Sequence, residues 1–290
     1  MALSWLWALP LLGLLPWGLN RAIRHGLAAP RVRETGSPEG LPWQAVVVPT
    51  RNGKQLFGWF IPAAPRAPAL VVMHGWGGNA EMMLPLAAPL HQAGYTLLLM
   101  DARCHGGSDD DSFASLPRFA EDIEAGLAWL GDQSGVDASR LGIVGHSVGA
   151  GAALLAASRI SAVRAVVSLA AFAHPATMMK RWLAGKRIPY WPLGAYILRY
   201  VQRVIGYRFD DIAPVRTISS IGCPVMLIHG QEDEIVPLAD AEAIHAAGTP
   251  GRVQLLAVAG SHDDYGDIER SLAVVTDFLS AAFSESPAAT

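Results

Sequence analysis

A serine flanked by glycines, at the junction of two apolar stretches, restricts the fold of this chain more than any other feature. Residues 141–144 have mostly apolar strand character and lead into Gly-His-Ser-Val-Gly at 145–149, and small side chains at 150–158 follow with helical character. Ser147 is therefore expected on a sharp strand-to-helix turn, called a nucleophile elbow. Such a turn strains the serine backbone and needs glycine two positions to either side, because strand and helix pass closely there. The glycines that meet this need are Gly145 and Gly149.

Apolar segments of strand length alternate with amphipathic segments of helix length along most of the chain. A hairpin is expected around the Asn-Gly step at 52–53. Buried strands separated by amphipathic helices predict an α/β fold with a mostly parallel sheet and helices on both faces. The expected strands are residues 45–48, 55–61, 69–73, 95–100, 141–144, 165–169, 224–228 and 253–258, and the expected helices are residues 80–93, 116–130, 150–158, 238–247 and 268–283.

Length and composition indicate one large domain and exclude some partners. A chain of 290 residues that is 51% hydrophobic can bury one large core, which we place at residues 43–285, with a short tail at 286–290. A net charge of −3 gives no basic field for nucleic acid. Cys104 and Cys223 are expected at opposite edges of the sheet and hence as free thiols. The oligomeric state is left open.

The first twenty residues carry no charged side chain, and Leu and Trp dominate residues 3–19. As a helix this segment would match the roughly 30 Å hydrocarbon layer, which predicts a single-pass membrane anchor at 1–20. The alternative is a signal peptide, which usually has a positive start and a shorter apolar core. Residues 21–42 are expected to form a linker. This linker contains Arg21, Arg24, Arg31 and Arg33. Positive charge directly after an apolar segment favours a cytoplasmic position for the main domain.

Residues 172–209 interrupt the alternation and are too long and too apolar for a flexible loop. They are expected to form a helical cap inserted over the strand ends. The segment contains seven Lys or Arg residues, several aromatic residues and no Asp or Glu. Such a surface suits lipid headgroups or an acyl substrate with an anionic end; the alternative is a lid whose aromatic side chains pack on the sheet. The candidates for substrate contact are Trp182, Trp191 and Tyr196.

A serine hydroxyl becomes a nucleophile when a base accepts its proton and a third group orients that base. In sheets of this kind, residues that handle ligands follow the carboxyl ends of strands. Asp233 follows the strand expected at 224–228, and His262 follows the one at 253–258. The order Ser, Asp, His belongs with this elbow. Glu232 and Glu234 are alternatives to Asp233.

A second requirement of acyl chemistry is a pair of donors for the developing oxyanion. The glycine-rich sequence His74-Gly75-Trp76-Gly77-Gly78 directly follows an expected strand and could offer the Trp76 amide. The Val148 amide, at the start of the helix after the elbow, is the second candidate. Taken alone, the glycine-rich sequence would be an ordinary turn.

Together these motifs resemble the α/β-hydrolase superfamily over roughly residues 45–283, most closely the membrane-anchored or secreted serine hydrolases grouped with serine aminopeptidase-like and Bem46-like proteins. The resemblance implies a Ser147–Asp233–His262 triad, since the spacing of Asp233 to the following Ile-Val-Pro favours it over its neighbours. It implies an acyl hydrolase that works through an acyl-enzyme, and the basic, aromatic cap leads us to expect acyl esters or thioesters of moderate chain length. It also implies a structural role for Asp101 and His105. Cys104 stands where the family usually has glycine, which suggests sensitivity to thiol reagents.

Two other functions remain open. An exopeptidase acting on short peptides would need an acid that binds the peptide amine, and Asp263 and Asp264 are the candidates. A membrane-tethered binding protein on the same fold would not need the triad. The sequence contains no metal, nucleotide or flavin signature, and the three aspartates at 109–111 are expected in a solvated loop.

Overall fold

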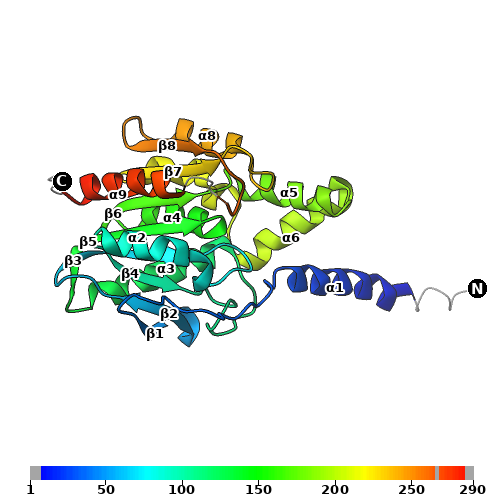
Figure 1. Cartoon of the computed structure of the whole chain (residues 1–290). Coiled ribbons are helices and arrows are strands. Elements are labelled where there is room, and N and C mark those ends of the chain that lie inside the picture. The colour runs from blue at the N-terminus through cyan, green and yellow to red at the C-terminus, as the bar shows by residue number, and fades with distance from the viewer. Residues whose placement is uncertain (1–7, 265–267, 285–290) are drawn as a thin grey trace, which may run out of the picture.

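An eight-stranded sheet organises the protein (Figure 1), which is described here from a computed structural model covering residues 8–264 and 268–284. The strand order is β1-β2-β4-β3-β5-β6-β7-β8. β1 and β4 both pair antiparallel with β2, and the remaining neighbours pair in parallel. The strands are β1 (Gln44–Pro49), β2 (Gln55–Ile61), β3 (Ala67–Met73), β4 (Thr96–Met100), β5 (Val136–His146), β6 (Val163–Leu169), β7 (Val225–Gly230) and β8 (Val253–Val258).

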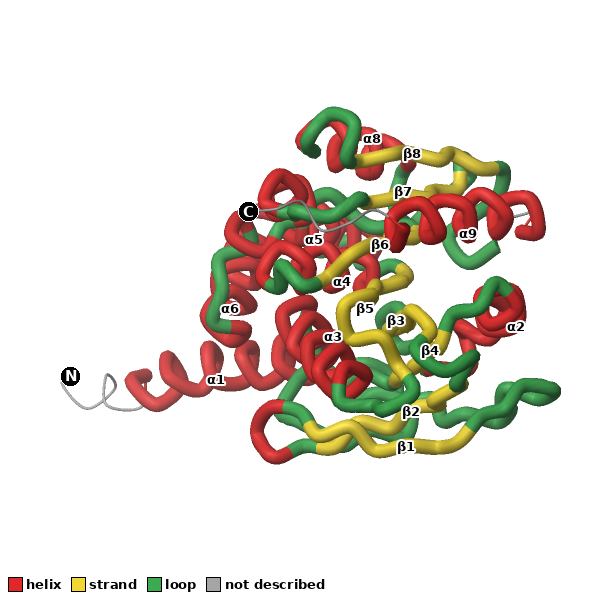
Figure 2. Tube along the Cα trace, turned by 90° about the vertical axis from the view of Figure 1, so that its left-hand side faces the viewer, coloured by secondary structure: helices red, strands yellow, loops and turns green. Residues whose placement is uncertain are grey.

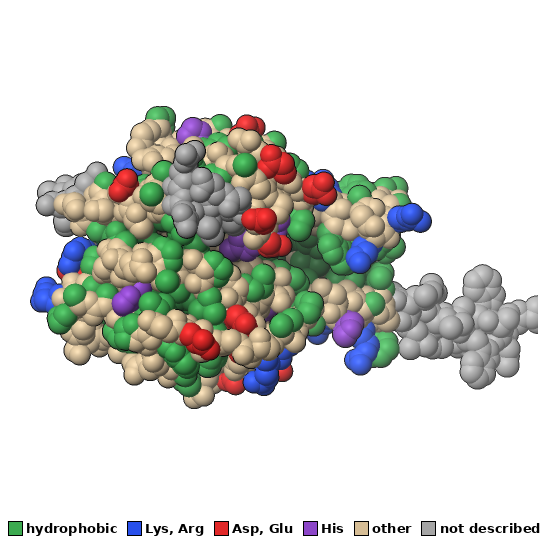
Figure 3. Space-filling view, in the orientation of Figure 1, with side chains coloured by type: hydrophobic (Ala, Val, Ile, Leu, Met, Phe, Trp, Pro, Cys, Tyr) green, Lys and Arg blue, Asp and Glu red, His purple; other side chains and the backbone are tan. Residues whose placement is uncertain are grey.

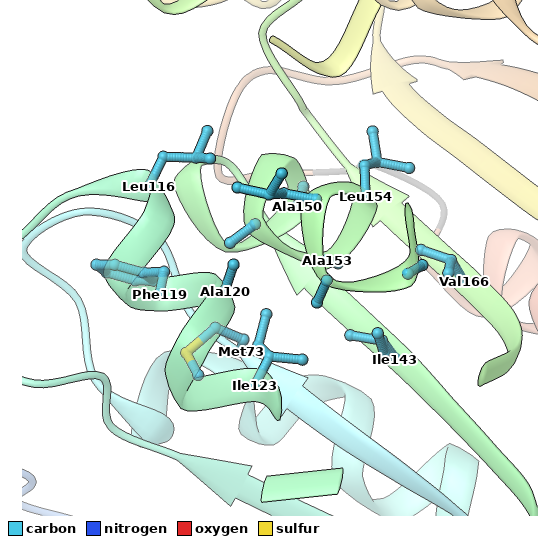
Figure 4. Close-up of a cluster of buried hydrophobic side chains, with 14 of the residues drawn as sticks. Met73, Leu116, Phe119, Ala120, Ile123, Ile143, Ala150, Ala153, Leu154 and Val166 are labelled. Atoms are coloured by element: carbon cyan, nitrogen blue, oxygen red, sulfur yellow. The ribbon is translucent and has the colours of Figure 1, made fainter. Parts of the chain in front are cut away.

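Helices cover both faces of this sheet (Figure 2). On one face lie α2 (Leu84–Gln92) and α9 (Ile268–Ser284), and on the other lie α3 (Leu116–Gly131), α4 (Val148–Arg159) and α8 (Leu238–Ala247). Successive residues of β3 point to opposite faces, so that Val71 packs toward α3 and α4 while Leu70 and Val72 pack toward α2 and α9. Figure 4 shows the hydrophobic core on the face covered by α3 and α4, with Phe119 and Ile123 of α3 against Ala150 and Ala153 of α4. The expected α/β architecture is confirmed.

The first hairpin forms as expected, with residues 50–54 joining β1 to β2 and both Asn52 and Gly53 at positive φ. Two other elements differ from the expectation. β5 starts at Val136, because Val136 pairs with Ala67 at the start of β3 before the register shifts and Leu141 pairs with Ala69. The helix expected at 80–93 is divided into a 3-10 turn (Ala80–Met83) and α2, which has proline at 85 and 89. Proline favours a new helix start and removes an internal hydrogen bond.

The N-terminal helix α1 (Ala8–Gly26) continues past the expected boundary at residue 20, because the sequence holds no glycine or proline between 19 and 25. Within residues 8–264 and 268–284, none of the helices combines the length and the hydrophobicity that crossing a bilayer requires. The first seven residues of the expected anchor lie outside the described part. α1 contacts the cap, where Arg24 donates to the Tyr200 hydroxyl at 2.9 Å and Tyr196 donates to Asn20 at 2.8 Å.

Residues 27–36, expected to be part of a linker, form a strap that lies along the loops following β3 and β4. The carbonyl of Leu27 accepts a hydrogen bond from the Ala114 amide, and that of Val32 accepts one from the Asn79 side chain. Arg31 donates to the carbonyl of Ser108 at 2.8 Å and pairs with Asp110. The strap is therefore a packed part of the domain.

The cap follows β6 and consists of α5 (Pro175–Gly185), a helical turn (Tyr190–Gly194) and α6 (Ala195–Ile205). In Figures 1 and 2, α5 and α6 project from the same end of the sheet, on the side where α1 lies. The chain then returns to β7 through three short helices, which are Asp210–Ile212, α7 (Pro214–Thr217) and Ile218–Ser220. α5, the turn and α6 all lie within residues 172–209, the segment expected to form a cap.

Candidate active site

Ser147 lies on a strained turn between β5 and α4. Its backbone angles are φ 54° and ψ −115°, a conformation that costs energy for any residue with a Cβ. A Cβ at position 145 would lie 2.4 Å from the carbonyl oxygen of Gly149, and one at position 149 would lie 2.4 Å from that of His74. Both positions therefore require glycine. The Ser147 amide donates to the carbonyl of Leu169 at 2.8 Å, which fixes the turn against β6.

A continuous chain of hydrogen bonds joins Ser147, His262 and Asp233. His262 Nε2 lies 3.0 Å from Ser147 Oγ, and its Nδ1 lies 2.7 Å from Asp233 Oδ2. Because a carboxylate only accepts, Nδ1 donates to Asp233, and Nε2 is the ring nitrogen that faces the serine hydroxyl. The side chain of Asp233 is fully buried. The arrangement has the geometry of a nucleophile, a base and an orienting acid.

The loops after β7 and β8 lie close enough to bring Asp233 and His262 together. A Cβ at Gly230 would lie 2.4 Å from the carbonyl oxygen of Gly260, so the approach requires glycine. Glu232 also joins the loop after β7 to the loop after β8, since its carboxylate accepts from the Gly260 amide at 2.5 Å. Asp233 Oδ1 accepts from the amides of residues 235 and 236, which leaves Oδ2 for His262. Asp233, rather than its acidic neighbours, therefore contacts the imidazole.

The glycine-rich turn after β3 lies against the elbow. A Cβ at Gly75 would be 3.1 Å from Ser147 Cβ, so the backbone leading to Trp76 passes next to the serine. His74 is fully buried, donates from Nδ1 to the Gly75 carbonyl at 2.6 Å and accepts at Nε2 from the Ala102 amide at 3.0 Å. Burial, followed by the neighbouring His105, lowers the pKa of His74 to about 3. A neutral imidazole thus holds the turn that carries one candidate oxyanion amide.

His146 takes part in the site although sequence reasoning gave it no role. Its ring is buried beside that of His262, and Nε2 lies 2.9 Å from the backbone carbonyl of His262. Burial, as the largest cause, lowers the pKa of His146 and keeps it neutral. A second such residue is His229, whose buried Nε2 donates to the Val236 carbonyl at 2.7 Å and lies 3.3 Å from Asp233 Oδ2. Both lie at the carboxyl end of a strand, His146 in β5 and His229 in β7, a position that could have indicated them.

Asp101 and His105 hold the loop after β4, as expected. Asp101 accepts from the amides of Ala80 and Gly107, each at 2.7 Å, and His105 Nδ1 bonds the carbonyl of Arg103. Glu34 of the strap lies against Asp101, and its Oε1 is buried with no other hydrogen-bond partner. Two carboxylates this close retain a shared proton. Burial and then Glu34 raise the pKa of Asp101 to about 8.

Cys104 does not fit the suggested sensitivity to thiol reagents. It is buried, and its Sγ contacts the amide and the carbonyl of Asp111, each at 3.2 Å. Burial, the largest cause, raises the pKa of this thiol, which lowers its reactivity. Its φ of 68° lies in the left-handed region, which explains why glycine suits the position. Cys223 is also free and buried.

One group of residues in the described part could offer three ligand atoms to a metal ion, namely His146, His262 and Asp263. Both imidazoles already have other partners, since His262 bonds Ser147 and Asp233 while His146 bonds a carbonyl. An ion here would compete with those bonds, so we assign no metal to the group. The three aspartates at 109–111 bind arginine side chains or a backbone amide instead.

The three cap residues expected to contact substrate are all partly exposed. Trp191 lines a cavity within the cap, whereas Trp182 and Tyr196 do not. Lys186 lies over the Trp182 ring, and Tyr196 stacks on Tyr200 and bonds Asn20 of α1. These three aromatic side chains therefore face solvent or α1, whereas Phe172 and Phe209 of the same segment are buried in the core.

Comparison with known proteins agrees with this fold. The sequence model for the alpha/beta hydrolase fold matches residues 68–191. The uncharacterised protein Rv2307c of Mycobacterium tuberculosis is 32% identical over 222 residues, which are 76% of this chain and 72% of that protein. The uncharacterised YfhR of Escherichia coli K12 is 26% identical over 259 residues, covering 84% and 83% of the two chains. The chain belongs to the α/β-hydrolase superfamily.

Solved structures show the same fold. The esterase Pf2001 of Pyrococcus furiosus superposes with a TM-score of 0.71 at 22% identity, covering 87% of this chain and 98% of the esterase. Est1E of Butyrivibrio proteoclasticus, solved with bound ferulic acid, gives a TM-score of 0.65 at 20% identity, covering 83% and 100%. At such identities the likeness concerns the fold.

Proposed function

We propose that the protein is a serine hydrolase that cleaves acyl ester or thioester bonds through an acyl-enzyme. The observation that carries the proposal is the hydrogen-bond chain from Ser147 Oγ through His262 to Asp233. The structural neighbour Pf2001 is named as an esterase, which supports an ester substrate.

In the first half-reaction, Ser147 Oγ attacks the acyl carbonyl carbon while His262 Nε2 accepts the hydroxyl proton. Asp233 holds the ring through Nδ1 and stabilises the imidazolium that forms. The carbonyl oxygen becomes an oxyanion, for which the amides of Trp76 and Val148 are the proposed donors. Each such donor typically lowers the barrier by roughly 3 kcal/mol.

The tetrahedral intermediate then collapses. The bond between the carbonyl carbon and the leaving group breaks, and His262 returns its proton to the alcohol or thiol that leaves. In the second half-reaction a water molecule attacks the acyl-Ser147 ester, and His262 accepts the proton of that water. When the second intermediate collapses, the bond between the acyl carbon and Ser147 Oγ breaks, His262 returns its proton to that oxygen, and the carboxylic acid leaves.

A fluorophosphonate probe tests the nucleophile without knowledge of the substrate. We expect stoichiometric labelling of the wild-type protein at Ser147 and none of Ser147→Ala. The matched control is Ser158→Ala on α4, which keeps the triad and should label normally. Labelling of Ser147→Ala to the wild-type extent would refute the assignment.

The bond class is tested with p-nitrophenyl esters from acetate to decanoate, acyl thioesters and aminoacyl p-nitroanilides. The proposal expects turnover of esters or thioesters with a maximum at moderate chain length. Turnover confined to aminoacyl anilides would instead indicate an exopeptidase, with Asp263 beside His146 as a candidate for binding the amine. A labelled protein that turns over neither class would indicate another acyl substrate.

We further propose that residues 1–20 anchor the protein to a membrane and that the main domain faces the cytoplasm. The uncharged, Leu- and Trp-rich sequence before Arg21 supports this proposal. The full chain should stay in the membrane fraction after an alkaline carbonate wash, whereas a chain beginning at residue 21 should not. Release of the full chain by the wash would contradict the anchor, and digestion of the main domain by protease added to intact spheroplasts would contradict its orientation.

A further inference from the structure

The cap contains a cavity of about 560 Å³ that is separate from the triad. Its walls come from α5, the turn at Tyr190–Gly194, α6 and residues 208–210, and they include none of Ser147, Asp233 and His262. The volume lies within the range of roughly 300–1,000 Å³ that small-molecule sites occupy. The catalytic geometry makes no use of this cavity.

Positive charge gathers in the cavity without enough negative charge to balance it. Lys180 of α5, Arg199 of α6 and Arg208 line it, together with one carboxylate, that of Asp210. That carboxylate is 3.0 Å from His174 Nε2 and 3.6 Å from Arg208. Among the described residues Arg199 forms no ion pair or hydrogen bond, and Lys180 contacts only the face of the Tyr190 ring, at 4.8 Å. An anion could therefore bind without displacing an existing pair of Lys180 or Arg199.

The remaining wall is apolar and aromatic. Tyr190 and Trp191 line the cavity with Leu198 and Phe209, although Tyr190 is 50% and Trp191 76% exposed. Large aromatic side chains exposed side by side on a surface are typical of binding sites. Figure 3 shows hydrophobic and basic side chains gathered over the cap, at the right of the view, with acidic ones mainly elsewhere. The cavity thus combines a cationic part with an apolar part.

We propose that this cavity binds a small amphipathic anion, with a carboxylate or phosphate group at Lys180 and Arg199 and an apolar or aromatic body against Tyr190 and Trp191. Charge-assisted hydrogen bonds to the two cations hold the anionic group. The ligand contacts α5, the turn and α6 at once, so its binding holds these three elements together. This proposal goes beyond the proposed function. Because its test measures ligand binding, the result does not depend on whether the protein is a serine hydrolase.

Calorimetric titration of the full-length protein tests the proposal, with octanoate and phenyl phosphate as probes and 1-octanol and phenol as neutral analogues. We expect both anions to bind at least tenfold more tightly than their neutral analogues, and more weakly in high salt. Arg199→Gln should weaken anion binding about tenfold and the double variant Lys180→Gln/Arg199→Gln further. Arg203→Gln, an exposed arginine one turn along α6 that does not line the cavity, is the matched control and should bind as the wild type does.

Equal affinity for anions and neutral analogues would overturn the proposal, as would an Arg203→Gln loss equal to that of Arg199→Gln. The altered side chains are exposed, so the variants should fold, and thermal melts check this. Vesicles distinguish the source of the anion. If vesicles with anionic lipid displace octanoate and zwitterionic vesicles do not, the ligand is a lipid headgroup; if neither displaces it, the ligand is a soluble organic anion.

Discussion

His146 Nε2 donates a hydrogen bond of 2.9 Å to the backbone carbonyl of His262, and so joins the residue before the nucleophile to the residue that would deprotonate it. The bond links the end of β5 with the loop after β8 and leaves the His262 ring free to contact Ser147 and Asp233. We infer that His146 positions His262.

Removing that donor should lower kcat more than it changes KM. His146→Phe is expected to reduce kcat about tenfold, because losing one buried hydrogen bond costs about 1 kcal/mol and loosens the base. His146→Gln, which can still donate, should recover part of the loss. His245→Gln, an exposed histidine on α8, should behave as the wild type. Equal kcat values for the Phe and Gln variants would show that the donor is unimportant.

Asp233→Asn should lower kcat by roughly 10³- to 10⁴-fold with little change in folding, because an amide no longer fixes the tautomer of His262. Steady-state kinetics on the best ester of the panel measures this. Glu234→Gln, an exposed acid one residue away, is the control and should retain activity. A large loss in the control with a small loss in Asp233→Asn would reassign the orienting acid.

The raised pKa of Asp101, which lies beside Glu34, should lower the free energy of unfolding as the pH rises. The pKa of Asp101 is raised from 3.8 to about 8, so between these values the folded state keeps a proton that the unfolded state releases. Its contribution to the free energy of unfolding is complete below about pH 4 and falls as the pH approaches 8, by up to about 1.4 kcal/mol per pH unit.

Denaturant titrations between pH 6.5 and 8, compared between the wild type and variants of Glu34, measure this effect. Below 6.5 the buried His74, whose pKa is lowered to about 3, contributes a slope of the opposite sign, because the unfolded state then binds the extra proton. Glu34→Gln should flatten the slope, since it removes the acidic partner of Asp101. Glu39→Gln, an exposed acid just after the strap, should leave the slope unchanged. An unaltered slope in Glu34→Gln would contradict the shared proton.

Replacing Arg103 should destabilise the protein strongly. Its guanidinium bonds Asp122 at 2.7 Å, and both side chains are 1% exposed. Arg103→Met leaves the Asp122 carboxylate buried without its charged partner, which costs about 3–5 kcal/mol. Arg140→Met, which breaks a partly exposed pair with Asp137, should cost less than about 1 kcal/mol. Urea denaturation of the two variants gives the comparison.

Neither cysteine should react with a thiol reagent while the protein is folded. Cys104 and Cys223 are both buried, and burial raises the pKa of both thiols. Titration with Ellman's reagent should detect both thiols in denaturant and almost none in native buffer. Rapid native labelling that Cys104→Ser abolishes would show that the loop after β4 opens.

The sequence was sufficient for the parts of the fold that depend on local pattern. Strand-length apolar runs located the parallel strands, and the glycines around Ser147 located the elbow, because their spacing reflects a close approach of backbone segments. The geometry also brings together the three residues chosen for the triad, although their catalytic role remains a prediction.

Contacts between distant segments could not be predicted in the same way. Nothing local to Glu34 indicates that it lies against Asp101, and nothing local to His146 indicates a bond to a carbonyl 116 residues further along. Such contacts depend on how loops from different strands pack. The division of the helix expected at 80–93 is a different case, because it has a local cause. The prolines at 85 and 89 are signals that the sequence itself contains.

The strap at residues 27–36 has a practical consequence for anyone who shortens this protein. A chain that starts at β1 would deprive Asn79, Glu81 and Asp101 of partners and uncover the turn that carries Trp76. Loss of activity in such a truncation would then reflect damage beside the nucleophile rather than removal of the N-terminal helix. Truncations intended for assays or crystals should begin no later than residue 27.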